Sequence, residues 1–150
     1  MIAYTSTIFH SFDTRRDFLK QAEAVLEFTG TIGLTDLMLP DTPLSTISSV
    51  LMRIICFFAN VPFHNLITQA EYEAIFKELG FTQLEIEDIT QDVFPGLAGY
   101  IDRLGADPVM GAALDPAKLQ QYKMFAKVLR WWSGGRLRFV LVKAMKGVKR

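Results

Sequence analysis

Apolar residues recur along this chain with two different spacings, and the alternation between them predicts an α/β protein. Phe18, Ala22 and Leu26 follow one another at helical spacing, and Thr14 stands where a helix cap is expected. A short β-rich run over 31–39 then lies between Gly30 and a proline. Such a short run is typical of a strand buried in the centre of a sheet.

The same alternation continues to the end of the chain. A capping box formed by Thr68 and Glu71 starts one helix, and Gly80 ends it. Apolar and polar residues alternate over 81–90 and predict a strand with one face more exposed to water. Pro95 is expected in the first turn of the short helix that follows this strand. The expected elements are helices over 44–60, 68–80, 93–104 and 115–132 and strands over 31–39, 81–90 and 136–144.

Helices and strands in this order favour a single α/β domain, residues 1–150, with at least one parallel crossover. Three or four strands make a narrow sheet flanked by helices. The strand over 31–37 is predicted to be buried on both faces, and the neighbours that a preceding half of the sheet would supply are expected to be absent, which leaves an edge on this strand or on the adjacent one. An apolar edge of this kind pairs with other chains, so we expect self-association or pairing with a full-length relative.

Composition and charge exclude several kinds of protein. Half of the residues are apolar and the formal net charge is zero, which gives no overall attraction to nucleic acid. One cysteine, Cys56, among apolar neighbours predicts a buried, unreactive thiol. The start of the chain has no secretory signal, so we expect a cytoplasmic protein.

The apolar stretch 47–61 is shorter than the roughly 20 residues of a membrane span and carries Arg53. It is predicted to be a buried helix or a lid over a substrate site.

Charge is also distributed unevenly. No acidic residue follows Asp115, whereas ten basic residues do. Two interpretations stay open: a basic patch for an anionic partner, or a basic element packed beside the acidic middle of the chain with a solvated tail. The second is favoured because aromatic and basic residues do not alternate as they do on nucleic-acid-binding surfaces.

Several short motifs occur in an order that resembles one known family. They are the segment 12–19, a strand that ends in Asp36, the Glu-Leu-Gly-Phe turn at 78–81, and the strand end Asp88-Ile89-Thr90. Together they resemble the C-terminal half of class I S-adenosylmethionine-dependent methyltransferases, in the methyltransferase type 11 family. The resemblance implies a partial Rossmann-like methyltransferase sheet. It also implies methyl transfer from S-adenosylmethionine to a small-molecule acceptor.

Four residues are candidates for the site. The family has an aromatic-His pair beside the cofactor, and the resemblance places either Tyr4 or the pair Phe9 and His10 there, with His10 as a catalytic base. The alternative for His10 is a surface histidine. Asp36 ends the best strand, at the edge where open α/β sheets bind ligands, and is a candidate for catalysis and for acceptor binding. Its alternative is a carboxylate that caps a loop. Asp36→Asn is expected to leave folding nearly intact and to reduce methyl transfer once a missing cofactor half is restored, whereas unchanged turnover would favour the capping role. Arg53 is a candidate for an acidic acceptor, although a long side chain that reaches solvent explains it equally simply.

The family's cofactor motifs are missing from the sequence. No Gly-x-Gly-x-Gly loop follows a first strand, and no acidic residue is placed to bind a ribose. We therefore expect a truncated or split methyltransferase that binds S-adenosylmethionine weakly or not at all by itself. The alternative is a non-catalytic methyltransferase-like fragment or interaction module.

Overall fold

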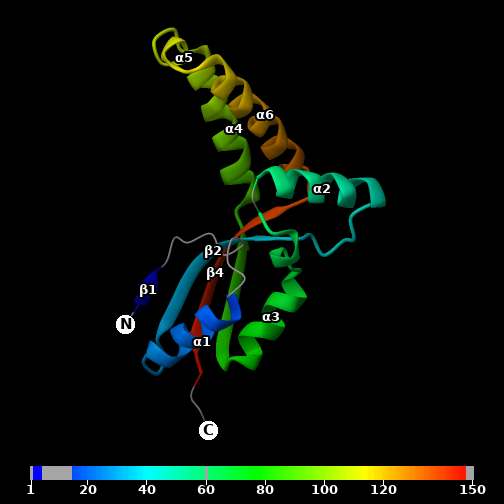
Figure 1. Ribbon diagram of the computed structural model, residues 1–150. Coiled ribbons are helices and arrows are strands. Elements are labelled where there is room, and N and C mark those ends of the chain that lie inside the picture. The colour runs from blue at the N-terminus through cyan, green and yellow to red at the C-terminus, as the bar shows by residue number, and fades with distance from the viewer. Residues whose placement is uncertain (1, 5–14, 60, 148–150) are drawn as a thin grey trace.

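A computed structural model describes residues 2–4, 15–59 and 61–147, and a four-stranded sheet organises them (Figure 1). The strands are β1 (Ile2–Tyr4), β2 (Thr31–Met38), β3 (Phe81–Asp88) and β4 (Arg138–Lys146), in the spatial order β1-β2-β4-β3. β4 is antiparallel to β2 and β3, and β1 is parallel to β2. The carboxyl ends of β1, β2 and β3 therefore lie at the same end of the sheet. This confirms an α/β fold with a narrow, partial sheet.

β2 has more neighbours than the sequence suggested. It pairs with β4 along its whole length, from Thr31 opposite Met145 to Met38 opposite Arg138. On its other side, β1 pairs with the first three residues, and Met38 bridges to Ile67. A strand from the far end of the sequence thus fills the β4 side, whereas the other side of β2 pairs over only three residues with β1 and at one bridge with Ile67 in the described part of the chain.

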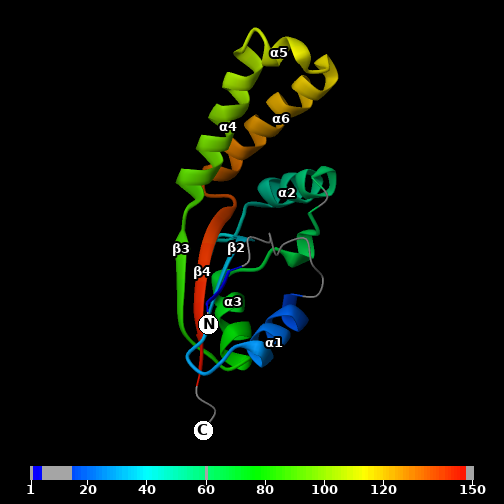
Figure 2. The ribbon, with the colours of Figure 1, turned by 90° about the vertical axis from the view of Figure 1, so that its left-hand side faces the viewer.

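One face of the sheet carries the main core. Helices α1 (Arg15–Val25) and α3 (Gln69–Glu78) cover this face (Figure 2). Alternate residues of β4, such as Val140 and Val142, are buried there, whereas Leu141 between them is 40% exposed. In β2, Thr31, Gly33 and Thr35 are only partly buried. The prediction that β2 is fully buried on both faces is therefore wrong for the face that points away from α1 and α3.

The remaining helices gather beyond the carboxyl ends of β2 and β3 (Figure 1). α2 (Thr46–Phe58) follows β2, and a 3-10 turn, η2 (Phe63–Asn65), leads on to α3. α4 (Thr90–Ala106), the short α5 (Met110–Ala113) and α6 (Pro116–Ser133) form a helical hairpin between β3 and β4. None of the described helices is long and apolar enough to cross a bilayer.

Local signals explain most of the helix ends. The Thr68–Glu71 capping box is formed in both directions, and Gly80 follows α3 with a φ of +83°. The Asp115 carboxylate accepts a hydrogen bond from the Ala117 N–H and caps α6. Each of these predictions is confirmed.

The helix predicted over 93–104 is wrong at its start. It begins at Thr90, because the Asp88 carboxylate accepts the Thr90 N–H, and the Thr90 hydroxyl accepts the Phe139 N–H from β4. Pro95 consequently lies inside the helix, beyond its first turn. The strand before it is shorter than predicted and ends at Asp88, and the last strand is shifted to Arg138–Lys146. Tertiary contacts with β4 set these boundaries.

Candidate functional site

Asp36 lies near the carboxyl end of β2 and is completely buried. One of its oxygens, Oδ1, accepts the N–H of Leu37 at 2.8 Å. The other, Oδ2, accepts a hydrogen bond of 2.8 Å from Nη2 of Arg15. Both carboxylate oxygens are thus already bonded within the protein.

Arg15, the first residue of α1, joins three elements. Its Nη2 bonds to Asp36 of β2, and its Nη1 donates to the backbone carbonyl of Asn65 in η2 at 2.8 Å. Its guanidinium also lies over the ring of Tyr72 in α3, with 5.5 Å from Cζ to the ring centroid. Arg15 itself is only 7% exposed, so α1, β2, η2 and α3 converge on a buried cation.

Two groups in this cluster have shifted pKa values. Burial raises the pKa of Asp36 above its usual value, and the Arg15 charge opposes this increase. Burial raises the pKa of Tyr72 well above 10, and the nearby Asp36 carboxylate raises it further. The Tyr72 hydroxyl and the Arg15 Nε are buried without a hydrogen-bond partner in the described part of the chain.

The predicted site residues do not come together in one place. Arg53 lies on α2, is exposed, and holds its guanidinium 4.3 Å from the ring centroid of Phe63. η2 links it to the Asp36 cluster, because Phe63 contacts Arg53 and the Asn65 carbonyl accepts a hydrogen bond from Arg15. Phe9 and His10 lie outside the described residues, so their roles stay predictions. The described contacts of Asp36 hold Arg15 and the backbone of Leu37 in place, and its predicted roles in catalysis and acceptor binding stay predictions.

A groove between α2 and α6 was not expected from the sequence. It has a volume of about 630 Å³. Its walls are almost entirely apolar and consist of Ile55, Phe58, Ala59, Gln121, Met124, Phe125 and Val128. It lies beyond the carboxyl ends of the parallel strands, where open α/β sheets bind ligands. The apolar residues on a second side of α2 were the signal in the sequence that could have indicated it.

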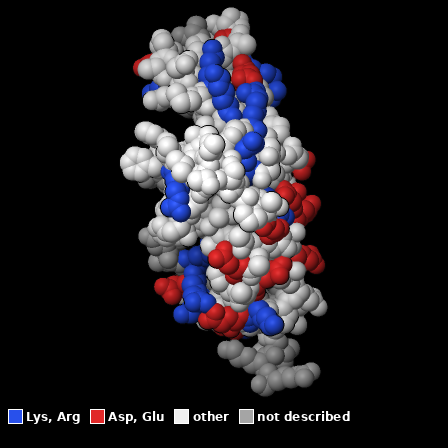
Figure 3. All heavy atoms as spheres, turned by 90° about the vertical axis from the view of Figure 1, so that its right-hand side faces the viewer, with Lys and Arg blue, Asp and Glu red and all other residues white. Residues whose placement is uncertain are grey.

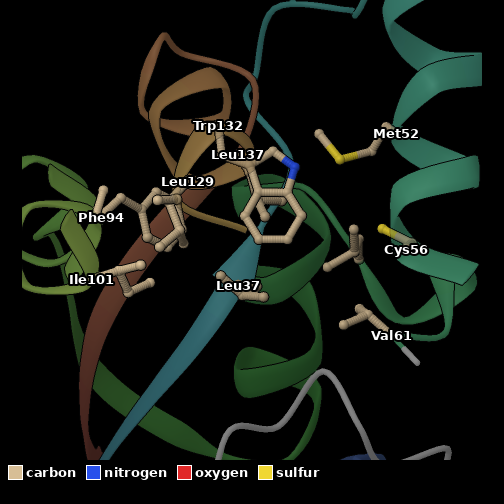
Figure 4. Packing of buried hydrophobic residues seen from close by; sticks show 12 residues of the cluster. Leu37, Met52, Cys56, Val61, Phe94, Ile101, Leu129, Trp132 and Leu137 are labelled. Atoms are coloured by element: carbon tan, nitrogen blue, oxygen red, sulfur yellow. The ribbon is translucent and has the colours of Figure 1, made fainter. Parts of the chain in front are cut away.

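A second core cluster fixes the position of α2 beside this groove (Figure 4). The Trp132 ring of α6 lies in the middle, with Met52 and Cys56 of α2 on one side and Phe94 and Ile101 of α4 on the other. Met52 and Cys56 are 0% and 1% exposed. Burial raises the pKa of Cys56 to about 11, and the prediction that this thiol is buried is confirmed.

The described residues do not supply a cradle for S-adenosylmethionine. Their glycines serve other purposes: Gly80 and Gly135 adopt positive φ in turns, and Gly30 is packed against the backbone of Glu27. None of the described glycines forms a loop between a strand and the start of a helix that would allow a cofactor to approach the backbone closely. In addition, no group of three His, Cys, Asp or Glu side chains within the described ranges could hold a metal ion.

Solved structures with the same fold are S-adenosylmethionine-dependent methyltransferases and related enzymes. Phosphoethanolamine N-methyltransferase 2 of Haemonchus contortus, in complex with phosphomonomethylethanolamine and S-adenosylhomocysteine, matches 98% of this chain with a TM-score of 0.81 and 15% identity. A cyclopropane synthase of Mycobacterium tuberculosis matches 97% with a TM-score of 0.74 and 16% identity. A methyltransferase of Galdieria sulphuraria, described as a putative sarcosine dimethylglycine enzyme, matches 97% with a TM-score of 0.71 and 15% identity.

The match extends over only part of each of these proteins. The chain spans 33% of the Haemonchus enzyme, 55% of the cyclopropane synthase and 52% of the Galdieria protein. Neither a protein-family model nor a curated protein sequence matches it. At this identity the comparison confirms the resemblance to class I methyltransferases as one of fold. The partial coverage is consistent with the predicted C-terminal half.

Proposed function

We propose that this chain forms the acceptor-side part of an S-adenosylmethionine-dependent methyltransferase that acts on a small molecule. The observation that carries the proposal is the fold: β4 inserted antiparallel between β2 and β3, with nearly the whole chain superimposing on methyltransferases. Fold alone does not determine function, so the support from the candidate site matters as well.

The position and lining of the groove support this role. α2 and α6 meet beyond the carboxyl ends of the parallel strands, and the groove offers apolar walls with Gln121 as a polar group. A pocket of this size and character fits a small ligand with an apolar portion. We therefore assign the acceptor to the α2–α6 groove, and we assign to the Arg15–Asp36 pair the task of holding α1 and η2 in position.

Cofactor binding requires residues beyond those described. Because the described residues lack a glycine cradle, we infer that the chain on its own binds S-adenosylmethionine weakly or not at all. In the proposed enzyme, a further segment or partner supplies the cofactor half. The roles of Phe9 and His10 beside the cofactor remain predictions.

The second candidate function is a non-catalytic interaction module. Two observations favour it: the absence of a glycine cradle in the described residues and the large apolar exposure of α2. Such a module would act by pairing with a methyltransferase or with another copy of itself, and it would need no acceptor in the groove.

A fusion protein distinguishes the two functions. The part of the Galdieria methyltransferase that precedes the matched region is joined to this chain, and circular dichroism verifies that the fusion folds. Calorimetry with S-adenosylhomocysteine and transfer of a tritiated methyl group to amine and fatty-acyl acceptors are then measured. We expect binding and transfer by the fusion, with turnover lowered by Val128→Glu in the groove and unchanged by Val25→Glu on α1. A folded fusion that binds the cofactor but methylates no acceptor would favour the interaction module.

A further inference from the structure

α2 is apolar on two opposite sides, and only one of them is used in the core. Met52 and Cys56 are buried against the hairpin and β2, whereas Ile47, Phe57 and Phe58 are 81%, 80% and 81% exposed. The exposed residues recur every three or four positions over the whole helix. We call them the α2 stripe: Ile47, Val50, Leu51, Ile54, Phe57 and Phe58. The expectation of a fully buried helix is therefore wrong for this side.

Basic residues lie on α2 and on α6, and neither helix contains an acidic residue. Arg53 lies on α2 itself. Lys118, Lys123 and Lys127 on α6 make no ion pair within the described part of the chain, whereas Arg130 is paired with Asp102. Lys123 and Lys127 are four residues apart, so they share a side of the helix, and Met124 beside them is 60% exposed.

The acidic residues lie elsewhere on the surface. In Figure 3 a row of Lys and Arg side chains follows the hairpin above an uncoloured area, while the acidic side chains gather mainly on the lower part of the molecule. Glu85, Glu87 and Asp88 of β3 belong to that lower part. Lys and Arg side chains also lie among these acids, so the lower part carries both signs, and Lys143 pairs with Glu85 and Arg138 with Asp88.

We propose that the α2 stripe and the flanking cations of α2 and α6 bind the surface of an anionic lipid bilayer. Exposed Ile and Phe side chains enter the boundary between head groups and acyl chains, and Arg53, Lys123 and Lys127 face the anionic head groups. The apolar α2–α6 groove is continuous with the α2 stripe, because Phe58 belongs to both.

Charge favours a bilayer over a second copy of this chain. A symmetric dimer through α2 places the same patch on both sides of the interface. It would bring Arg53 and the α6 lysines near their own counterparts, without a carboxylate on either helix to compensate them. An anionic surface neutralises the same cations. This inference does not depend on the proposed methyl transfer.

Vesicle co-sedimentation of the full chain tests the proposal. The probes are phosphatidylcholine vesicles with and without about one quarter phosphatidylglycerol, at low and high salt. We expect binding to the anionic vesicles that salt weakens, and much weaker binding to the neutral ones. Lys123→Gln with Lys127→Gln should weaken binding about 25-fold, because each cation near an anionic surface contributes roughly fivefold. Ile47→Ser with Phe57→Ser should weaken it more than tenfold without a change in charge.

Two matched controls lie at the opposite end of the molecule. Val25→Ser on α1 removes a side chain that is 73% exposed, and Lys77→Gln on α3 removes one exposed cation. Both should bind vesicles as the unaltered protein does. The proposal is overturned if the unaltered chain ignores anionic vesicles, or if the controls weaken binding as much as the α2 and α6 variants. It is also overturned if sedimentation equilibrium shows a dimer that Ile47→Ser with Phe57→Ser dissociates while vesicle binding is absent.

Discussion

The guanidinium of Arg15 donates a 2.8 Å hydrogen bond to the carboxylate of Asp36, 21 positions later, in a site where Asp36 has no exposed surface. The two residues belong to α1 and β2, and the same guanidinium reaches the carbonyl of Asn65. A single buried ion pair therefore fixes the start of α1, the end of β2 and the turn before α3.

This pair changes the expectation for Asp36. Asp36→Asn leaves the Arg15 charge buried without a counter-ion, which costs about 3–5 kcal/mol when one partner of a buried pair is lost. Urea unfolding should therefore show a large loss of stability. The matched control is Asp17→Asn in the exposed first turn of α1, which should cost less than about 1 kcal/mol. Equal midpoints for Asp36→Asn and the unaltered protein would contradict a structural role for the pair.

The cap of α3 should give a measurable pH dependence. Hydrogen bonds from the backbone and side chain of Thr68 lower the pKa of Glu71 below its usual value of 4.5. A lowered pKa in the folded state gives stability that is present above 4.5 and lost as the pH falls through the folded value. Glu71→Gln should therefore be less stable than the unaltered protein at pH 7, by about 1 kcal/mol or less. The difference should shrink toward pH 3, and thermal unfolding at both pH values measures it.

Two neighbouring residues of α2 should respond very differently to truncation. Met52→Ala opens a cavity in the cluster around Trp132 and should cost about 2–5 kcal/mol. Leu51→Ala removes a side chain that is 40% exposed and should cost far less, since little buried surface is lost. Chemical denaturation of both variants checks this. Similar losses would show that α2 is not docked through Met52.

The same substitution at two glycines should change stability in opposite directions. A Cβ added at Gly80 or at Gly96 meets nothing within 4 Å, so neither change creates a clash. Gly80 has a φ of +83°, which a side chain disfavours, so Gly80→Ala should destabilise by about 1 kcal/mol. Gly96 lies inside α4, where alanine is the better helix former, so Gly96→Ala should stabilise by about 0.5–1 kcal/mol. Melting temperatures shifted in the same direction would contradict the backbone argument.

Local signals in the sequence were sufficient for the α/β class and for most helix ends. The Thr68–Glu71 capping box, the Asp115 cap and Gly80 each act within a few residues, so their effect can be recognised without knowing the fold. The order of motifs along the chain was likewise enough for the resemblance to methyltransferases, because that order survives where sequence identity falls to 15%.

The site was decided by contacts between distant segments. Arg15 and Asn65 are 50 positions apart, and the groove joins α2 to α6 across more than 60 residues, so no local pattern reveals either. Likewise, the sequence showed that the helix at 46–58 is apolar, but not which side is buried. Packing against Trp132 chose the Met52 side and left Ile47 and Phe57 at the surface, because a helix can bury only the side that faces its neighbours.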